Sequence, residues 1–294
     1  MSGKVENIMS LAGIDYANKT DIGIRNLFNR VFKNGMHGLC FSPYEEGQEP
    51  GTQISGEQIR RRIEIILPYT KWIRSFSCTE GNELIPRIAR EYGIKTFVGA
   101  WLGKDPEINK REMSGLINLA NEGLVDIAAV GNEVMYRGDL TEAELLQFMY
   151  QFKKAVPNIP MGYVDAYYEF TKRPKIADAS DVILANCYPF WEGCSLEYSL
   201  VYMKEMYNEA IRAANGKKVI ISETGWPNLG SSFEGAHPSQ ENAIKYFINA
   251  QLWSAQSNIE MFYFSSFDES WKVGSEGDVG AFWGLWDKDE KLKF

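Results

Sequence analysis

The sequence predicts an α/β protein with a single domain, a (β/α)8 TIM barrel that spans residues 1–294. Three observations indicate this fold: eight short runs rich in β-branched and aromatic residues, helical patterns between them, and even spacing. The runs start about 32 residues apart, which is the size of one strand-plus-helix unit. Eight such units in a chain of this length favour a closed barrel.

The predicted strands span residues 38–44, 72–78, 95–102, 125–134, 161–167, 182–190, 218–224 and 260–266. Between them, Ser55 with Gln58 and Thr141 with Glu144 have the pattern of capping boxes that begin helices. A further helix is predicted from residue 196 to 211, where the apolar residues recur on one face and Gly216 follows. The alternative is an open, doubly wound sheet. No GxGxxG follows any strand, and the even spacing continues to the end, which favours closure.

Residues 1–35 form an N-terminal segment before the first strand. Within it, Ile24, Leu27, Phe28 and Phe32 predict a helix that closes the floor of the barrel. The first ten residues lack the apolar core of a signal peptide. A leader could have been removed, so this says little about the compartment. No apolar run reaches the ~18 residues of a membrane span.

Composition excludes some classes of ligand. The net charge of −8 argues against nucleic acid, because phosphate binding needs a basic surface. The aromatic content of 13% fits either a large core or flat platforms for sugar rings. The only histidines are His37 and His237, which nearly excludes a histidine-rich metal site and weakens any Ser-His-Asp scheme.

The four cysteines sit in or near strand-like runs without a metal-type CxxC pair. Free, buried thiols are the favoured interpretation of Cys40, Cys78, Cys187 and Cys194. A disulfide between Cys187 and Cys194 is the alternative.

Two glutamates end predicted strands in similar contexts. Glu133 lies in GNEV at the end of the fourth strand, and Glu223 lies in ISETGWP at the end of the seventh. Side chains alternate along a strand, and barrel active sites lie at the carboxyl ends of strands. By this alternation Glu133 points to the same face of its strand as residues 127, 129 and 131, and Glu223 to the same face as residues 219 and 221. If those residues fill the barrel interior, both glutamates emerge above the same core and face each other across its mouth.

A pair of neighbouring carboxylates suits glycosidic bond cleavage. One protonates the leaving oxygen while the other attacks the sugar or directs a water. Neighbouring carboxylates titrate as a coupled pair, so one can stay protonated near neutrality while its partner ionises. A strand-end salt bridge would explain either glutamate alone, but not the matched pair.

The sequence also resembles glycoside hydrolase family 17, the β-1,3-glucanases. The resemblance rests on GNEV, SETGWP, IRSFSC…IPRIAREYGIKTFVGAW, NCYPFWEG and FDESWKVGSEG…FWGLWD, in this order over most of the chain. It implies a retaining (β/α)8 hydrolase in which Glu133 is the general acid/base and Glu223 is the nucleophile. It also implies an endo-acting enzyme of the bacterial laminarinase type that needs no cofactor or metal.

The same resemblance gives neighbouring residues roles. It implies that Asn132 binds the sugar 2-hydroxyl and that Tyr188 positions the nucleophile. Tyr44, Arg74 and Trp101 are further candidates for the cleft, and Trp226 is a candidate for either substrate contact or a structural role with Pro227. Glu269, Lys272 and Glu276 resemble an additional charged group of the family, for which a solvated loop is the alternative. No insertion after a strand is large enough for the extra subdomain of some plant relatives, so the cleft is expected to be shorter or straighter.

Three rival functions remain open. A β-1,3-glucanosyltransferase would use the same two glutamates, with a sugar hydroxyl in place of water. A glucan-binding protein without turnover would not require both glutamates. A barrel lyase or aldolase would need a metal or a Schiff-base lysine, and Lys95 and Lys218 lie at strand starts instead. The expected partner is a β-1,3-glucan, bound by a monomer that is secreted, periplasmic or at the cell surface.

Overall fold

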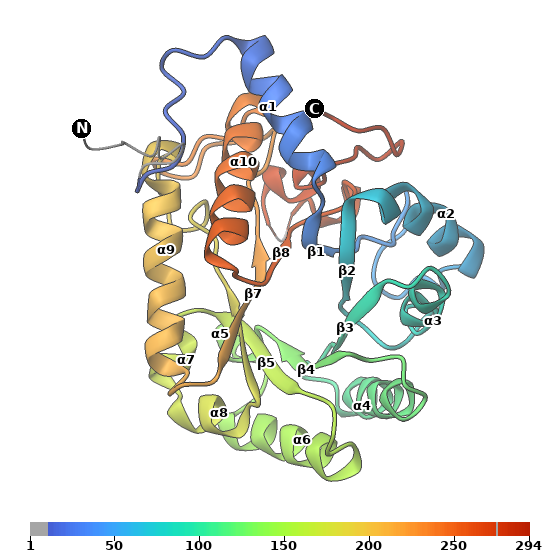
Figure 1. The fold of residues 1–294 in the computed structure, drawn as a ribbon. Coiled ribbons are helices and arrows are strands. Elements are labelled where there is room, and N and C mark those ends of the chain that lie inside the picture. The colour runs from blue at the N-terminus through green and yellow to red at the C-terminus, as the bar shows by residue number, and fades with distance from the viewer. Residues whose placement is uncertain (1–10, 275) are drawn as a thin grey trace.

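Eight parallel strands form a closed barrel in the computed structural model, which describes residues 11–274 and 276–294. The strands pair in chain order, and β8 pairs with β1 to close the ring. They are β1 (Met36–Cys40), β2 (Thr70–Ser75), β3 (Lys95–Ala100), β4 (Ile127–Asn132), β5 (Met161–Ala166), β6 (Val182–Asn186), β7 (Lys218–Thr224) and β8 (Met261–Tyr263). The predicted (β/α)8 fold is therefore confirmed (Figure 1). The predicted strands mostly extend too far at their carboxyl ends, because residues that line the barrel mouth also have strand-like patterns.

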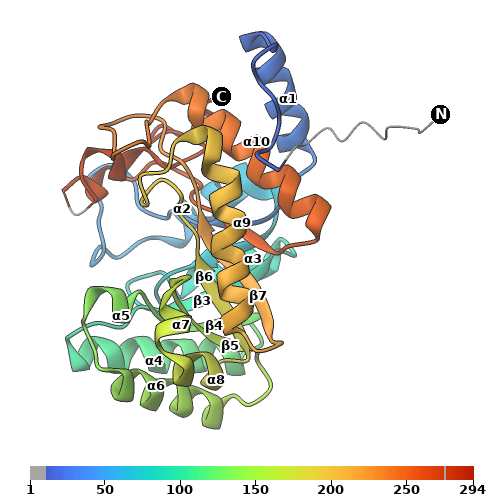
Figure 2. The same ribbon diagram turned by 90° about the vertical axis from the view of Figure 1, so that its left-hand side faces the viewer.

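Helices cover the outside of the barrel. They are α1 (Asp21–Lys33), α2 (Gly56–Ile66), α3 (Leu84–Glu91), α4 (Pro106–Asn121), α5 (Val134–Arg137), α6 (Glu142–Ala155), α7 (Glu169–Lys172), α8 (Pro174–Ala179), α9 (Leu196–Ala213) and α10 (Gln240–Ser257), with 3-10 turns η1 (Leu67–Tyr69), η2 (Ser270–Lys272) and η3 (Asp278–Phe282). Figure 2 shows α9 crossing in front of β6 and β7, against which it packs. The predicted capping box is complete at Thr141 and Glu144, and Ser55 accepts a hydrogen bond from the N–H of Gln58.

The predicted N-terminal helix is present, but it does not close the barrel floor. Helix α1 lies on the outer wall beside α10 (Figure 1), where Phe28 packs against Phe247 at 5.1 Å between ring centroids. On the same helix, Phe32 stacks on Tyr69 of η1 at 4.2 Å between ring centroids. Among the described residues, no α-helix follows β8, and α1 fills the gap between α10 and η1. The floor prediction is wrong because the apolar face of α1 matches this gap. Residues 1–10 of the predicted segment lie outside the described residues.

The ends of β4 and β7 depart from regular alternation. The pairing of β4 with β5 shifts register between Ala129 and Asn132, and that of β6 with β7 shifts between Ala185 and Asn186. Each shift is a bulge that inserts an extra residue shortly before a glutamate, at residues 130–131 in β4 and at Ser222 in β7. At Gly131 the φ is +85°, and an added Cβ would approach Leu145 of α6 within 3.4 Å, so this position faces outward. The prediction that Gly131 and Glu133 point to the same face of the strand is therefore wrong, although both glutamates do reach the barrel mouth.

All four cysteines are free, and three of them are buried. Cys187 and Cys194 therefore do not form the alternative loop disulfide. Within the described residues, no helix combines the length and apolar character that a membrane span needs.

Close approach of β7 and β8 gives a test of the packing at the barrel mouth. A Cβ at Gly225 would overlap the carbonyl oxygen of Phe264, which is backbone and cannot move aside cheaply. We expect Gly225→Ala to lower the free energy of unfolding by about 1–3 kcal/mol, the usual range for overpacking. Gly103 has open space around a Cβ and no positive φ, so Gly103→Ala is the control and should be neutral or slightly stabilising. Urea titration of both variants measures this; equal stabilities would contradict the predicted overlap.

Candidate active site

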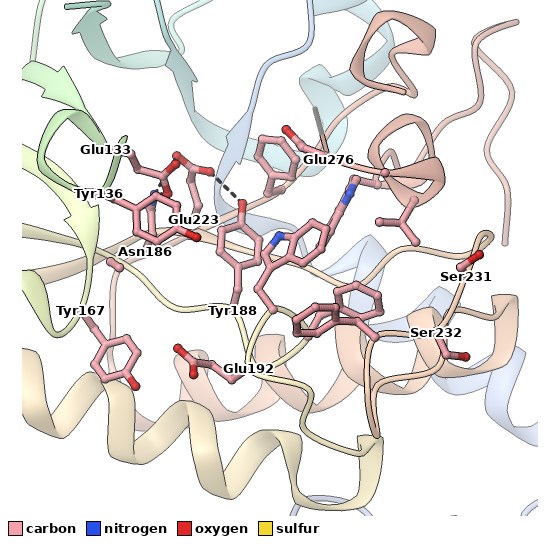
Figure 3. Close-up of a pocket in the computed structure, with 18 of the residues that line it drawn as sticks. Glu133, Tyr136, Tyr167, Asn186, Tyr188, Glu192, Glu223, Ser231, Ser232 and Glu276 are labelled. Atoms are coloured by element: carbon pink, nitrogen blue, oxygen red, sulfur yellow. Dashed lines mark hydrogen bonds between the residues drawn. The ribbon is translucent and has the colours of Figure 1, made fainter. Parts of the chain in front are cut away.

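Glu133 and Glu223 meet at the carboxyl end of the barrel through one shared partner. The side-chain nitrogen of Asn186, at the end of β6, donates to Glu133 Oε1 at 2.8 Å and to Glu223 Oε1 at 3.2 Å. The two carboxylate oxygens are therefore at most about 6 Å apart. Figure 3 shows the two carboxylates beside each other at one end of a cavity. The sequence-based expectation that they face each other is confirmed.

Three donors converge on the Glu223 carboxylate. Arg74 Nη1 forms a buried ion pair with Glu223 Oε1, and the Tyr188 hydroxyl donates to Oε2 at 2.7 Å (Figure 3). The other donor is Asn186. Arg74 also donates from Nη2 to Asn132 Oδ1 at 2.7 Å, which links the ends of β4 and β7. Burial is the largest influence on Arg74 and lowers its pKa, but the charge and hydrogen bond of Glu223, together with Cys40 and Tyr188, outweigh it and raise the pKa overall, so the guanidinium stays charged.

Glu133 has a different environment. Its backbone lies in the left-handed region at φ 51°, ψ 27°, which a non-glycine residue seldom adopts outside special sites. Burial raises the pKa of the Glu133 carboxyl to about 7, and the Glu223 and Asp165 charges act in the same direction. The hydrogen bond from Asn186 and the charge of Arg137 oppose this shift. A large fraction of Glu133 therefore holds a proton near neutral pH.

A second charged group lies close by. Lys272, 8% exposed, pairs with Glu269 Oε2 at 2.9 Å, and its Nζ lies 4.2 Å from the centre of the Phe264 ring. Burial raises the pKa of Glu276, while the charge of Lys272 opposes that shift. The sequence-based alternative, a solvated loop, is wrong for Glu269 and Lys272 because both are buried.

The cavity beside the glutamates has a volume of about 660 Å³. Polar lining residues include Asn186, Glu192, Ser231 and Asp278. Most of the larger side chains are aromatic: Tyr136, Tyr167, Tyr168, Tyr188, Phe190, Trp191, Phe233, Phe264 and Trp283. Aromatic faces and a few polar groups are suited to a sugar, which has apolar C–H faces and hydroxyl edges.

Seven predicted residues do not line this cavity: Tyr44, Arg74, Trp101, Asn132, Trp226, Glu269 and Lys272. Trp226 is 1% exposed, its indole N–H donates to the His237 carbonyl at 3.0 Å, and its ring packs on Phe190, so it lies behind the cavity wall. Tyr44 is also buried, with its ring edge-on to Trp271. Trp101 is 40% exposed, and Arg137 stacks over its ring at 4.7 Å.

Sequence reasoning missed several lining residues, Asn186 above all. Asn186 ends β6 in the stretch NCYPFWEG, two residues before the recognised Tyr188. An amide at the carboxyl end of a barrel strand is the signal that could have identified it. Tyr136 lies in the short helix α5, Tyr167 and Trp191 lie in turns, and none of them carries a comparable signal.

Across the described residues, no group of three or more His, Cys, Asp or Glu side chains could hold a metal ion.

A parallel barrel with two neighbouring glutamates at the ends of β4 and β7 has the architecture of a glycoside hydrolase. Residues 38–284 match the model of the BtgE/BtgC glycoside hydrolase domain. The chain therefore belongs to the BtgE/BtgC glycoside hydrolases, within glycoside hydrolase family 17.

Similar proteins agree with this membership. A glucan 1,3-beta-glucosidase from Arthroderma benhamiae is 29% identical over 238 residues, which cover 74% of this chain and 76% of that protein. A glucan 1,3-beta-glucosidase from Saccharomyces cerevisiae is 25% identical, covering 83% and 86%. The crystal structure of a family 17 beta-1,3-glucanosyltransferase from Rhizomucor miehei aligns with a TM-score of 0.80 at 28% identity, covering 89% and 96%. These relatives are fungal and give no support for the expected bacterial type.

The coupling between the glutamates gives a test of the site. Because the Glu223 charge raises the pKa of Glu133, replacing that charge in Glu223→Gln should lower the Glu133 pKa from about 7. Carboxyl 13C NMR of both proteins measures the change, with Glu133→Gln used to assign the signal. An unchanged or higher pKa in Glu223→Gln would contradict the coupling.

Proposed function

We propose that this protein is a retaining endo-hydrolase of β-1,3-glucan, with Glu223 as nucleophile and Glu133 as general acid/base. The observation that carries the proposal is the shared hydrogen bonding of both carboxylates to Asn186, together with a Glu133 pKa raised to about 7. The substrate class follows the names of the relatives, two of which are glucan 1,3-beta-glucosidases.

The first step forms a glycosyl-enzyme. A Glu223 oxygen attacks the anomeric carbon and forms the C–O bond, while the glycosidic C–O bond breaks and its electrons go to the leaving oxygen. Glu133 gives its proton to that oxygen. Arg74 and Tyr188 hold the attacking carboxylate by charge-assisted hydrogen bonds.

The second step releases the sugar. Glu133, now ionised, takes a proton from water as the water oxygen attacks the anomeric carbon, and the bond to Glu223 breaks. Each step inverts the anomeric carbon, so the β configuration is retained. Both glutamates are then back in their starting protonation states.

The spacing of the carboxylates supports retention over inversion. Their bonded oxygens lie within about 6 Å of each other, whereas inverting enzymes separate the carboxyl groups by roughly 6.5–9.5 Å to admit a water. Retaining enzymes use roughly 5–5.5 Å.

The cavity supports binding of more than the reacting sugar. Its aromatic lining continues from Tyr136 beside Glu133 to Phe233 near Ser231, which offers stacking faces for further glucosyl units. Asn132, held by Arg74, is proposed to bind the 2-hydroxyl, and Glu276 to contribute charge near the nucleophile. Tyr44, Trp101 and Trp226 are proposed as supports of the cleft, and the Lys272–Glu269 pair as a fixed charge beside it.

Transglycosylation is the second candidate, favoured by the similarity to the Rhizomucor miehei glucanosyltransferase. A sugar hydroxyl would then replace water in the second step. Products longer than the supplied laminari-oligosaccharide would identify this activity. In either case we propose that the whole chain acts as one monomeric domain outside the cytoplasm, where β-glucan polymers occur.

Substrate preference gives the first test of this proposal. We expect strong release of reducing sugar from laminarin and little from carboxymethylcellulose, because the relatives are named as acting on the β-1,3 linkage. Lichenan and curdlan complete the series. Comparable rates on carboxymethylcellulose and laminarin would refute the substrate assignment.

The second test separates the roles of the glutamates. Glu223→Ala should lose on the order of 10⁴–10⁶-fold in kcat on every β-glucoside, because the covalent route is lost. Glu133→Ala should still react with a dinitrophenyl laminari-oligosaccharide, whose leaving group needs no protonation.

Azide then identifies each role from the product. In Glu133→Ala, azide should restore turnover and give the β-glycosyl azide by two inversions. In Glu223→Ala, azide should give the α-azide by a single inversion. NMR of the isolated azides reads the configuration; an α-azide from Glu133→Ala would reverse the two roles.

A further inference from the structure

The short helix that follows Glu133 is fixed by hydrogen bonds to residues that do not line the cavity. Helix α5 begins directly after Glu133, and no side chain of its own segment caps it. The first N–H groups of a helix need partners from elsewhere. Here the neighbouring strand β5 supplies them.

Three consecutive residues of β5 hold three N–H groups around Glu133. The Val164 carbonyl accepts from the Glu133 N–H at 2.8 Å, and the Tyr163 hydroxyl accepts from the Met135 N–H at 2.8 Å. The Asp165 Oδ2 atom accepts from the Tyr136 N–H at 3.3 Å. The backbone on both sides of the left-handed Glu133 is thus fixed to one strand.

Tyr163 and Asp165 form one buried unit. The Tyr163 hydroxyl donates to Asp165 Oδ2, and the Ala166 N–H donates to Asp165 Oδ1 at 2.8 Å. Tyr163 is 1% exposed and Asp165 is fully buried. Neither lines the cavity. Burial raises the pKa of the Asp165 carboxyl, and the three hydrogen bonds that it accepts oppose that shift.

We propose that Tyr163 and Asp165 are positioning residues for the acid/base Glu133: by fixing the N–H groups of Met135 and Tyr136, they hold the strained backbone that aims its carboxyl. This inference rests on the proposed function of Glu133. Positioning of this kind matters because a displacement of about 1 Å at a reacting group can cost about 100-fold in rate.

Asp165 also acts on Glu133 through its charge. The charged groups that face Glu133 are Glu223 and Asp165, which favour the protonated form, and Arg137, which opposes it. The positive charge of Arg173 faces Asp165 in turn. Removing the Asp165 charge should therefore lower the Glu133 pKa, whereas Tyr163→Phe keeps that charge and should leave the pKa closer to its original value.

The test uses Asp165→Asn, Tyr163→Phe and a control on the same strand. Asp181 accepts a hydrogen bond from the Met161 N–H at 3.1 Å at the opposite end of β5, so Asp181→Asn loosens the strand without touching the Glu133 segment. For each protein, kcat/KM is measured on laminarin and on a dinitrophenyl laminari-oligosaccharide, together with the melting temperature. Because kcat/KM reports the first irreversible step, the dinitrophenyl substrate bypasses the acid function of Glu133.

We expect Asp165→Asn and Tyr163→Phe to lower kcat/KM on laminarin by about 10- to 100-fold, yet to change it less than about threefold on the dinitrophenyl substrate. Asp181→Asn should leave both values near wild type. Equal losses on the two substrates, or the same pattern in Asp181→Asn, would overturn the proposal. If Asp165→Asn does not fold, the pattern of Tyr163→Phe decides.

Carboxyl 13C NMR gives a readout that does not depend on substrate. The Glu133 pKa should fall in Asp165→Asn, and an unchanged value would contradict its predicted electrostatic role. Failure of the proposed function would look different: the wild-type protein would not hydrolyse laminarin, or Glu133→Ala would be inactive on the dinitrophenyl substrate too.

Discussion

The organisation of this protein depends on placing two carboxylates in one largely buried space. Like charges at such a distance repel strongly where water is scarce, so the pair is stable only if the surroundings compensate. A proton on Glu133 and the guanidinium of Arg74 provide that compensation. Arg74 is itself 1% exposed, so its charge depends equally on Glu223. The groups proposed for chemistry are thus also structural partners, because removing one would leave another charge buried and unpaired.

Irregular backbone at the ends of β4 and β7 sets the direction of the side chains in the site. A regular strand presents every second residue to the barrel mouth, which would give one functional side chain per strand end. The bulges before Glu133 and Glu223 change this. Ser222 and Glu223, adjacent in sequence, both bond to Asn186, and Asn132 and Glu133 bond to Arg74 and Asn186. Bulges often occur beside active sites, where they redirect a side chain. Two consecutive residues thereby reach the same small space from each of β4 and β7.

Much of this could be predicted from the sequence, because periodicity reports which faces are apolar. All eight strands and the positions of Glu133 and Glu223 at the barrel mouth follow from local patterns. The bulges do not, since β4 and β7 are buried on both faces and show no alternation that a one-residue shift could interrupt. Asn186 and the Tyr163–Asp165 unit were also missed, because their roles arise from neighbours 53 and 29 positions away along the chain. The outer position of α1 was missed for a similar reason: an amphipathic pattern shows that a face is buried but not what covers it.

The packing of α1 has a consequence for how the chain is made. The seam of the barrel joins β1 to β8, and the gap over it is covered by α1 packing on α10, so elements from the two ends of the chain complete each other. Contacts so distant in sequence form slowly because a long loop must close first. During synthesis, β1 is available about 220 residues before its partner β8, with an open strand edge and an uncovered apolar helix beside it. The seam between β1 and β8, with α1 beside it, is therefore the part of the nascent protein most exposed to association with other chains.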